Sequence, residues 1–262
     1  MRTRIIVLIS MMLFAFIGVD AFAENRLVRV AGDPYPPWTE GETGTKAAGG
    51  IAVEIVEELF ERLGMEARVL VYPFSRGLEQ IEHGEEDVIL MVSKSKEREQ
   101  FMAFSHPIRE VRFVFYHSSE LDSFEWGNWK DLKPYRIGSV TGYNMGDEWK
   151  EAITEYDLQV EEVKTDIFNL QKLLLGRIDL VVTDDEVMQR LIEMNPDSQG
   201  KLSKNNKPVF ESVNNLGISR KSFLLPMLPR INQVLQQMKG DGTFQKIFCK
   251  YGKIYRGSCE SS

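Results

Sequence analysis

The chain has 262 residues, of which 32 are Lys or Arg and 39 are Asp or Glu, so its formal net charge is −7. An acidic surface argues against nucleic acid and against anionic membrane surfaces as partners. Apolar residues make up 43% of the chain, which is enough for packed cores and excludes disorder by composition. The length exceeds a typical domain of about 100–150 residues, so we expect one large or two medium domains.

Residues 1–23 have the three parts of a secretory signal peptide. Arg2 and Arg4 give a basic start, an apolar run follows at 5–17, and the segment ends in Ala21-Phe22-Ala23, a small-x-small cleavage site. The apolar run is shorter than the roughly 20 residues of a membrane span. We therefore expect a secreted protein cleaved after Ala23, and the alternative is an uncleaved anchor helix.

Apolar periodicity alternates between strand and helix along the chain, which predicts α/β layers with largely parallel sheets. The first part has expected strands at 27–31, 67–72 and 87–92, with helices at 51–63 and around Leu78. The middle part has expected strands at 135–140 and 178–183, with helices around Trp149 and at 167–175 and 185–194. A strand at 216–219 and two helices complete the chain.

The first and middle parts share an internal pattern. The segment from Leu78 through Gly84 to Asp87 matches the segment from Leu170 through Gly176 to Asp179, and each reads as helix, glycine, aspartate and apolar strand. Two similar α/β units in tandem suggest two lobes built on one plan, unless the match is a coincidence of common α/β elements. Because the two aspartates recur at matching positions, we interpret them as structural and not as ligand contacts.

The C-terminal part lacks a complete unit of its own, so we expect it to pack back on the first lobe. Lobe 1 would then comprise 24–108 and 214–262, and lobe 2 would comprise 109–213. The chain would cross between the lobes near 107–112 and near 208–214. Paired crossings of this kind are what a hinge requires.

Two cysteines, Cys249 and Cys259, lie near the C-terminus. A secreted protein meets an oxidising compartment, so we expect a disulfide between them, and the alternative is two free thiols. A metal site is not expected there, because no histidine lies near them in the sequence.

Candidate site residues follow the predicted strands, because ligands bind at the carboxyl ends of strands in open parallel sheets. They carry both signs of charge together with aromatic rings, an inventory that suits a zwitterion such as an amino acid. Arg98 could hold a carboxylate, and Asp33 or Asp184 could hold an ammonium. The set is Asp33, Tyr35, Trp38, Phe74, Arg76, Ser93, Arg98, Gly142, Tyr143 and Asp184.

Each candidate also has an interpretation without a ligand. Arg98 could be a surface arginine, and Asp184 could cap the helix at 185–194, since aspartate is favoured there. Asp33 could organise the proline-rich turn that follows the first strand. Trp38 and Phe74 could pack in a core or hinge, and Arg76 could be an ion-pair partner between the lobes.

Enzyme chemistry has no clear signature in this sequence. The histidines, His83, His106 and His117, are scattered and form no metal-binding spacing. The sequence contains no Gly-x-Ser-x-Gly motif, phosphate-binding loop or dinucleotide fingerprint. We therefore expect a protein that is not an enzyme and has no metal or cofactor.

An ordered series of short motifs resembles the family 3 bacterial extracellular solute-binding proteins across essentially all of the mature chain. No single motif is specific, but their order and spacing together are. The series is Asp33-Pro34-Tyr35-Pro36-Pro37-Trp38, Gly50-Ile51-Ala52-Val53-Glu54-Ile55, Leu63-Gly64, Gly84 with Asp87, Ser93 to Arg98 ahead of Phe104-Ser105-His106-Pro107, Asp131-Leu132-Lys133, Gly176-Arg177-Ile178-Asp179, and Asp241-Gly242-Thr243-Phe244 near Lys250-Tyr251-Gly252.

The resemblance implies a two-lobed, type II periplasmic-binding-protein-like α/β fold with a two-strand hinge. It also implies a monomer in the periplasm that delivers an amino acid or similar solute to an inner-membrane ABC permease. Arg98 and Ser93 match positions that bind the ligand carboxylate, and Asp184 matches the lobe 2 acid that takes the ammonium. Asp33, Tyr35 and Phe74 match pocket positions of lobe 1, and Gly142 lies in the lobe 2 turn that donates amides to the ligand.

The sequence departs from the family pattern at Met91, where a small residue is usual and a methionine would narrow the pocket.

Two other functions are compatible with the same fold, since function is determined by the site and not by the fold. They are a ligand-sensing subunit for a membrane receptor and an enzyme of the dehydratase or cell-wall lytic type.

Overall fold

The structure is a computed structural model that describes residues 26–121 and 124–251. The expected signal peptide and Cys259 lie outside the described residues, so the cleavage after Ala23 and the disulfide stay predictions. Among the described residues, no helix is both long enough and apolar enough to cross a membrane.

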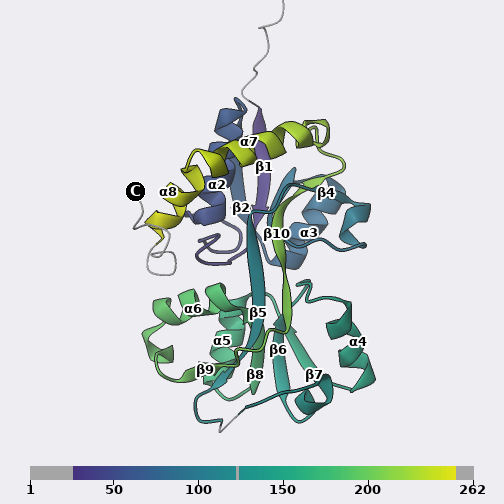
Figure 1. Ribbon diagram of the computed structural model, residues 1–262, viewed down its shortest axis with the longest axis vertical. Coiled ribbons are helices and arrows are strands. Elements are labelled where there is room, and N and C mark those ends of the chain that lie inside the picture. Colours follow the sequence, from purple (N-terminus) through teal and green to yellow (C-terminus); the bar gives the residue numbers. More distant parts are fainter. Residues whose placement is uncertain (1–25, 122–123, 252–262) are drawn as a thin grey trace, which may run out of the picture.

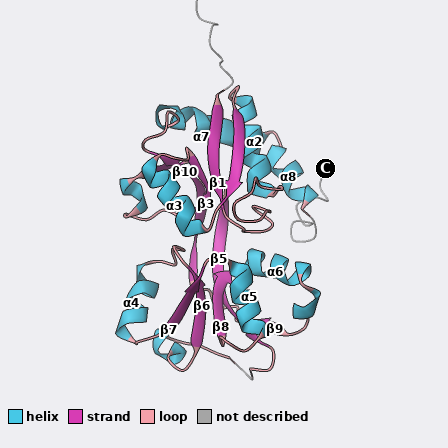
Figure 2. Ribbon diagram, turned by 180° about the vertical axis from the view of Figure 1, so that it is seen from behind, coloured by secondary structure: helices cyan, strands magenta, loops and turns pink. Residues whose placement is uncertain are grey.

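The upper lobe in Figure 1 is built on a mixed sheet. Strands β1 (Leu27–Gly32), β2 (Glu66–Val71) and β3 (Val88–Val92) are parallel, and β10 (Phe210–Ser219) runs antiparallel to β3 and to the short β4 (Met102–Phe104). The helices are α2 (Ile51–Arg62), α3 (Phe74–His83), α7 (Leu228–Gly240) and α8 (Thr243–Lys250). Figure 2 shows α3 on one side of this sheet and α2 and α8 on the other.

The lower lobe repeats this plan. Strand β6 (Arg136–Val140) lies parallel between β7 (Gln159–Val163) and β8 (Leu180–Asp184), while β5 (Arg109–Ser118) is antiparallel to β8 and to β9 (Leu202–Lys204). Helix α4 (Asp147–Glu155) lies on one side, and α5 (Asp166–Leu174) and α6 (Asp185–Met194) lie on the other.

Two long strands connect the lobes. β5 and β10 pair with each other between Arg109 and Phe113 on one strand and Phe210 and Asn214 on the other. They place both lobes on one continuous sheet path, β2-β1-β3-β10-β5-β8-β6-β7. The two-lobed α/β fold with a two-strand hinge is therefore the fold that the sequence predicted.

The strands of the hinge are longer than the sequence analysis anticipated. We expected a strand only at 216–219 and a crossing near 107–112, whereas β10 begins at Phe210 and β5 runs from Arg109 to Ser118. Charged residues alternate with apolar ones at the start of β5, because this part of the strand is not covered on both faces. The pattern therefore lacks the continuous apolar run by which we located the buried strands.

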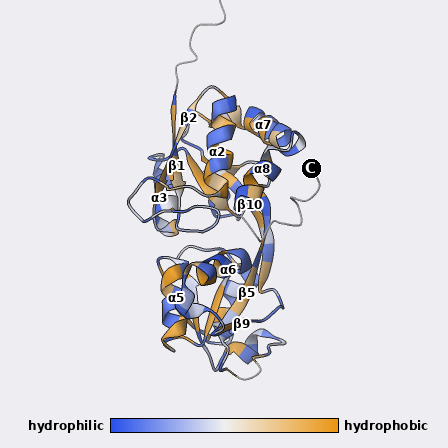
Figure 3. Ribbon diagram, turned by 90° about the vertical axis from the view of Figure 1, so that its left-hand side faces the viewer, coloured by the Kyte–Doolittle hydropathy of each residue, from blue (hydrophilic) through white to orange (hydrophobic). Residues whose placement is uncertain are grey.

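Hydropathy explains how the helices are placed. In Figure 3 hydrophobic residues lie on both strands and helices, and the helices α2 and α7 also carry hydrophilic turns. The buried face of α2 includes Ile51, Ile55 and Leu59 at helical spacing.

Gly50 precedes α2 with φ 123°, and a Cβ there would lie 2.4 Å from the carbonyl oxygen of Trp38, so only glycine fits. This close approach holds the loop after β1 against the start of α2.

The repeated aspartates make the same contacts in both lobes. Asp87 accepts hydrogen bonds from the backbone N, Nε and NH2 of Arg29 at 3.0–3.1 Å, and Arg29 also donates to the carbonyl of Gly84. Asp179 accepts the same three bonds from Arg136 at 2.8–3.0 Å, and Arg136 donates to the carbonyl of Gly176. The internal pattern of the sequence thus corresponds to an Arg–Asp ion pair that joins two strands and the end of a helix, and both aspartates are structural, as we interpreted them.

We predict that Asp87→Ala destabilises the protein more than Asp179→Ala. The side chain of Asp87 is 3% exposed and also accepts from Ser222, whereas that of Asp179 is 31% exposed. Loss of the buried acceptor should cost about 1–3 kcal/mol at residue 87. Urea unfolding followed by circular dichroism measures both variants, and an equal loss at the two positions would contradict the prediction.

Candidate functional site

A small cavity lies between the lobes beside the hinge. Its volume is about 20 Å³, which is space for one or two water molecules. Its walls are formed by Asp33, Tyr35, Phe74, Met91, Ser93, Arg98, Phe113, Tyr143, Asn144 and Asn214. Of the site residues that the sequence predicted, the structure brings Asp33, Tyr35, Phe74, Ser93, Arg98 and Tyr143 together here.

Arg98 is a buried cation in the cavity wall. It begins the short 3-10 turn η1 (Arg98–Gln100) and is 5% exposed. Its NH1 donates to the backbone oxygen and the hydroxyl of Ser93 at 2.8 and 3.1 Å, and its guanidinium lies 5.3 Å from the ring centre of Phe74. No carboxylate lies within ion-pair distance of Arg98 in the described part of the chain. Burial lowers the pKa of this guanidinium to about 10, so it is still charged at neutral pH.

Arg98 also connects the two lobes. Its NH2 donates to the carbonyl of Gly142, in the turn after β6, at 2.8 Å. Gly142 has φ 89°, a backbone conformation that glycine adopts without strain, and lies against Ser75 of α3. In this closed arrangement the turn therefore presents a carbonyl to Arg98.

Tyr143 fills the centre of the aromatic wall. Its ring packs edge-on against Tyr35, Phe74 and Phe113, with centroid distances of 6.0, 5.1 and 6.1 Å. Such edge-to-face pairs are favourable beyond the area that they bury. A residue of lobe 2 is thereby enclosed by two aromatic rings of lobe 1 and one ring of the hinge.

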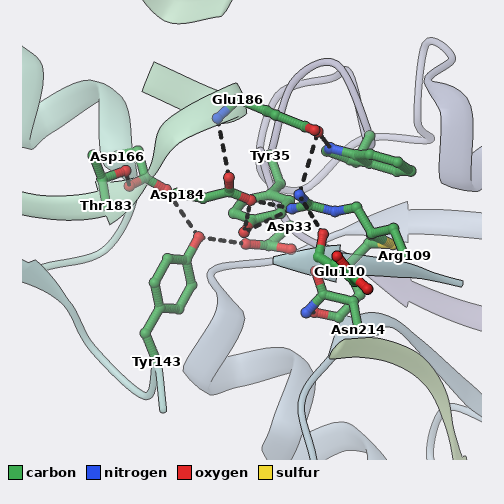
Figure 4. A network of polar contacts seen from close by, with 12 residues as sticks. Asp33, Tyr35, Arg109, Glu110, Tyr143, Asp166, Thr183, Asp184, Glu186 and Asn214 are labelled. Carbon is green, nitrogen blue, oxygen red and sulfur yellow. Dashed lines mark hydrogen bonds and ion pairs between the residues drawn. The ribbon is translucent and has the colours of Figure 1, made fainter. Parts of the chain in front are cut away.

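The hydroxyl of Tyr143 lies between two carboxylates, as Figure 4 shows. It is 3.1 Å from Asp33 Oδ2 and 2.9 Å from Asp166 Oδ2. Asp33 follows β1 in lobe 1, whereas Asp166 begins α5 in lobe 2 and accepts a second hydrogen bond from Thr183 at 2.8 Å. Burial, with the neighbouring charge of Asp166, raises the pKa of Asp33 to about 7. Burial also raises the pKa of Asp166 to about 6, against the lowering effect of its hydrogen bonds.

The carboxylate of Asp184 is bound by other residues of the protein. Its carboxylate forms an ion pair with Arg109, accepts a hydrogen bond from the hydroxyl of Tyr35 at 2.6 Å, and caps α6 by accepting from the backbone N of Glu186. Asp184 is 1% exposed and does not line the cavity. The structure thus gives it the helix-capping role that the sequence analysis left open.

Arg109 is the centre of a second buried network. It is the first residue of β5, its side chain is 7% exposed, and it pairs with both Asp184 and Glu186. Its guanidinium lies 4.4 Å from the ring centre of Trp38, where a cation–π contact is favourable. Burial, the largest single effect, lowers the pKa of Arg109, but the charges of Asp184, Tyr35 and Glu186 and the hydrogen bond to Asp184 together outweigh it, so the pKa lies above its usual value.

The remaining predicted residues lie outside the cavity. Trp38 is 1% exposed and donates to Glu186 Oε2 at 3.1 Å, so it packs beneath the Arg109 network. Arg76 lies on the outer face of α3, where its side chain is 53% exposed and pairs with Glu79. Gly142 borders the adjoining hollow of about 280 Å³, which shares Arg98, Tyr143 and Asn144 with the cavity.

Sequence reasoning missed several residues of the site. Arg109 and Phe113 lie on a strand that we did not predict, and Asn214 lies at a hinge crossing to which we assigned no side-chain role. Asp166 lies at the start of a helix, where an aspartate is ordinary, so only its burial reveals its position. Among the described residues, no group of three or more His, Cys, Asp or Glu side chains could hold a metal ion.

The chain matches the model of one protein family and several characterised proteins. The model for bacterial extracellular solute-binding proteins, family 3, matches residues 28–254. The "ABC transporter arginine-binding protein 1" of Escherichia coli (strain K12) is 24% identical over 216 residues, or 81% of this chain and 85% of that protein. The "L-cystine-binding protein TcyA" of Bacillus subtilis (strain 168) is 22% identical over 223 residues, or 83% of this chain and 77% of that protein.

A solved structure shows the same fold. An ancestral arginine-binding protein bound to arginine superposes with a TM-score of 0.72 at 23% identity, covering 87% of this chain and 98% of that one. These matches are to binding proteins and not to enzymes, in agreement with the expectation from the sequence.

We predict that Arg109→Met destabilises the protein by about 3–5 kcal/mol, because it leaves the buried Asp184 carboxylate without its cation. Arg112→Met is the matched control on the same strand, because Arg112 pairs with Glu211 at 3.5 Å and its side chain is 45% exposed. The control should change stability by less than about 1 kcal/mol. Adding Asp184→Asn should restore part of the loss, since both charges are then removed.

Chemical denaturation of the two single variants and the double variant measures these differences. Equal stability of Arg109→Met and Arg112→Met would show that the Arg109 pair does not stabilise the closed structure.

Proposed function

We propose a function from the premise that this chain belongs to the bacterial extracellular solute-binding proteins of family 3. In this proposal the protein binds a small zwitterion, an amino acid or a close relative, between its two lobes. The observation that supports it best is Arg98, a buried guanidinium in the cavity wall with no carboxylate partner in the described ranges. Burying a charge without a partner is costly, so this position favours a ligand that supplies an anion.

The ligand carboxylate would bind Arg98 and the hydroxyl of Ser93. The Ser93 hydroxyl lies 3.1 Å from Arg98 NH1, so both groups could donate to one carboxylate. In the closed protein the carbonyl of Gly142 accepts from Arg98 NH2. A carboxylate would compete for that donor, which requires the turn after β6 to withdraw while the ligand enters.

A positively charged group of the ligand would bind Asp33. We considered Asp33 and Asp184 for this role, and the geometry favours Asp33, because it lines the cavity while Asp184 is held by Arg109 and Tyr35. The side-chain oxygen of Asn214, in the same wall, has no hydrogen-bond donor among the described residues and offers a second acceptor. Tyr35, Phe74 and Tyr143 would enclose the rest of the ligand.

Binding would proceed by opening and closure of the lobes. A cavity of about 20 Å³ is too small for an amino acid, so the contacts between Arg98 and Gly142 and between Tyr143 and Asp33 must separate on entry. We propose that 24–108 with 214–262 and 109–213 are the two bodies that move. The hinge strands β5 and β10 would absorb the motion.

The biological setting follows from the family and stays a proposal. The signal peptide would be cleaved after Ala23, and the mature monomer would carry its ligand through the periplasm to an ABC permease. A disulfide between Cys249 and Cys259 would join the C-terminal tail to α8. The arginine-binding and cystine-binding relatives place these two amino acids first among the ligands to test.

A thermal-shift screen of residues 24–262, refolded to remove carried-over ligand, should identify the ligand among amino acids, dipeptides, amines, organic acids and sugars. A ligand at 100 times its Kd should stabilise the protein by about 2.7 kcal/mol. Arg98→Ala should then weaken binding by at least about 30-fold, because a buried carboxylate would lose its partner. The matched control is Arg76→Ala, an arginine of the same lobe that lies outside the cavity.

Calorimetric titration of both variants measures the affinities. Equal affinity of Arg98→Ala and Arg76→Ala would exclude Arg98 as the carboxylate site. No response to any α-amino acid in the screen would exclude the proposed ligand class.

Delivery to a permease predicts that deletion of the gene abolishes high-affinity uptake of the radiolabelled ligand. Re-expression of the wild-type chain should restore uptake, and re-expression of Arg98→Ala should not. Normal uptake in the deletion strain, together with tight binding by the purified protein, would favour a sensor for a membrane receptor.

A further inference from the structure

The hydroxyl of Tyr143 has one proton but two carboxylate neighbours. Its oxygen lies 3.1 Å from Asp33 Oδ2 and 2.9 Å from Asp166 Oδ2, both within hydrogen-bond distance. A phenol can donate one hydrogen bond and can accept others. If both carboxyls were ionised, one of them would face the phenol oxygen without a proton between the two atoms. Both contacts are hydrogen bonds only when one carboxyl holds a proton and donates it to Tyr143.

The surroundings of these three residues do not supply the missing positive charge. The charged and titratable groups around them are Asp184 at the end of β8, Tyr35 after β1, Arg109 at the start of β5, and Arg98 in η1. Arg109 is paired with Asp184 and Glu186, and Arg98 donates to Ser93 and Gly142. Thr183 and the first turn of α5 stabilise an ionised Asp166, which leaves Asp33 as the better proton holder. The pKa of Asp33 is raised to about 7 and that of Asp166 to about 6, which also favours Asp33 as the proton holder.

We propose that Asp33 and Asp166 share one proton through Tyr143 when the lobes close, and that a positively charged group of the ligand replaces this proton. The second half of this proposal rests on the proposed function, and the first half does not. Asp33 is the contact for the cation, because it lines the cavity. Asp166 is fully buried and acts through Tyr143, so it is a positioning residue.

The proton balance of the exchange is simple. Before the exchange, protonated Asp33 donates to Tyr143, and Tyr143 donates to ionised Asp166. When an ammonium or guanidinium group binds Asp33, the carboxyl releases its proton to solvent and becomes ionised. Tyr143 keeps its hydrogen bond to Asp166, and the total charge of the site is unchanged. A neutral ligand cannot replace the proton, so the site selects for a cation.

The pH dependence of closure follows from the same contacts. In open lobes both carboxyls are hydrated and have pKa values near 4, whereas closure raises the pKa of Asp33 to about 7 and that of Asp166 to about 6. Closure therefore takes up one proton between about pH 6 and pH 7 and up to two below about pH 6, and the stabilisation is complete below about pH 4. It is lost as pH rises through about 6 to 7. The protein without ligand should be more closed in acid than at pH 8.

Small-angle X-ray scattering of the refolded, ligand-free protein from pH 4.5 to 8.5 tests the shared proton. The radius of gyration of the wild type should rise across about pH 5.5–7.5. Asp166→Asn should make this rise shallower, because the amide oxygen still accepts from Thr183 while the amide NH2 donates to Tyr143, so Tyr143 can donate its own proton to ionised Asp33. The matched control, Glu79→Gln, changes a lobe 1 acid whose side chain is 54% exposed and should titrate like the wild type. A wild-type radius independent of pH, or one equally steep in Asp166→Asn, would overturn the shared proton.

Calorimetry with L-arginine at pH 6.0, in two buffers of different ionisation enthalpy, tests the exchange. The wild type should release on the order of one proton for each ligand bound, and Asp166→Asn should bind L-arginine with a clearly smaller release. A purely structural role of Asp166 would change affinity without changing the number of protons. Binding without proton release would overturn the exchange. Absence of L-arginine binding, with the scattering result as expected, would overturn the cation subsite and leave the shared proton standing.

Discussion

The buried ion pair between Arg109 and Asp184 determines how the lobes meet. Arg109 begins hinge strand β5, and its partner ends β8 and caps α6 in lobe 2. The same guanidinium lies over Trp38, and Asp184 accepts from Tyr35, so two residues of lobe 1 complete the network. Removing either charge would leave the other buried, which is costly. In the closed form, the contacts of Tyr35 and Trp38 with this network hold the loop after β1 at the hinge, and Asp33, in that loop, lies opposite lobe 2.

The charges left beside this pair give the cavity its polarity. Arg98 lies in one wall without an acidic partner among the described residues, while Asp33 and Asp166 meet at Tyr143. A carboxylate at one end and a cation at the other would neutralise both ends together, as a zwitterion does. The present closed form satisfies the same groups less completely, with a carbonyl of Gly142 at Arg98 and a shared proton at the acids. Ligand and closed protein thus compete for the same interactions, and this competition would couple binding to opening.

Much of the fold followed from the sequence, because its signals are local. Continuous apolar runs located β3 and β8, and the repeated Asp87 and Asp179 indicated an Arg–Asp ion pair that occurs in both lobes. The position of Arg98 after a buried strand was also a local signal. Arg109 gave none, since an arginine among charged residues resembles a surface arginine. Its burial depends on β5 pairing with β10, about a hundred residues away in the sequence, and no local pattern encodes that pairing.

Met91, where this sequence departs from the family pattern, lies in the wall of the cavity. It lies within β3 with φ 52°, a conformation that non-glycine residues rarely adopt, opposite an irregularity in the pairing with β10. Its carbonyl accepts from Asn214, and its side chain lines the cavity. The strand is thus distorted where lobe 1 meets the hinge, and a methionine occupies room beside Arg98. A ligand held there by its carboxylate must extend away from β3, toward Asp33 and Tyr143, which are the groups that carry the shared proton.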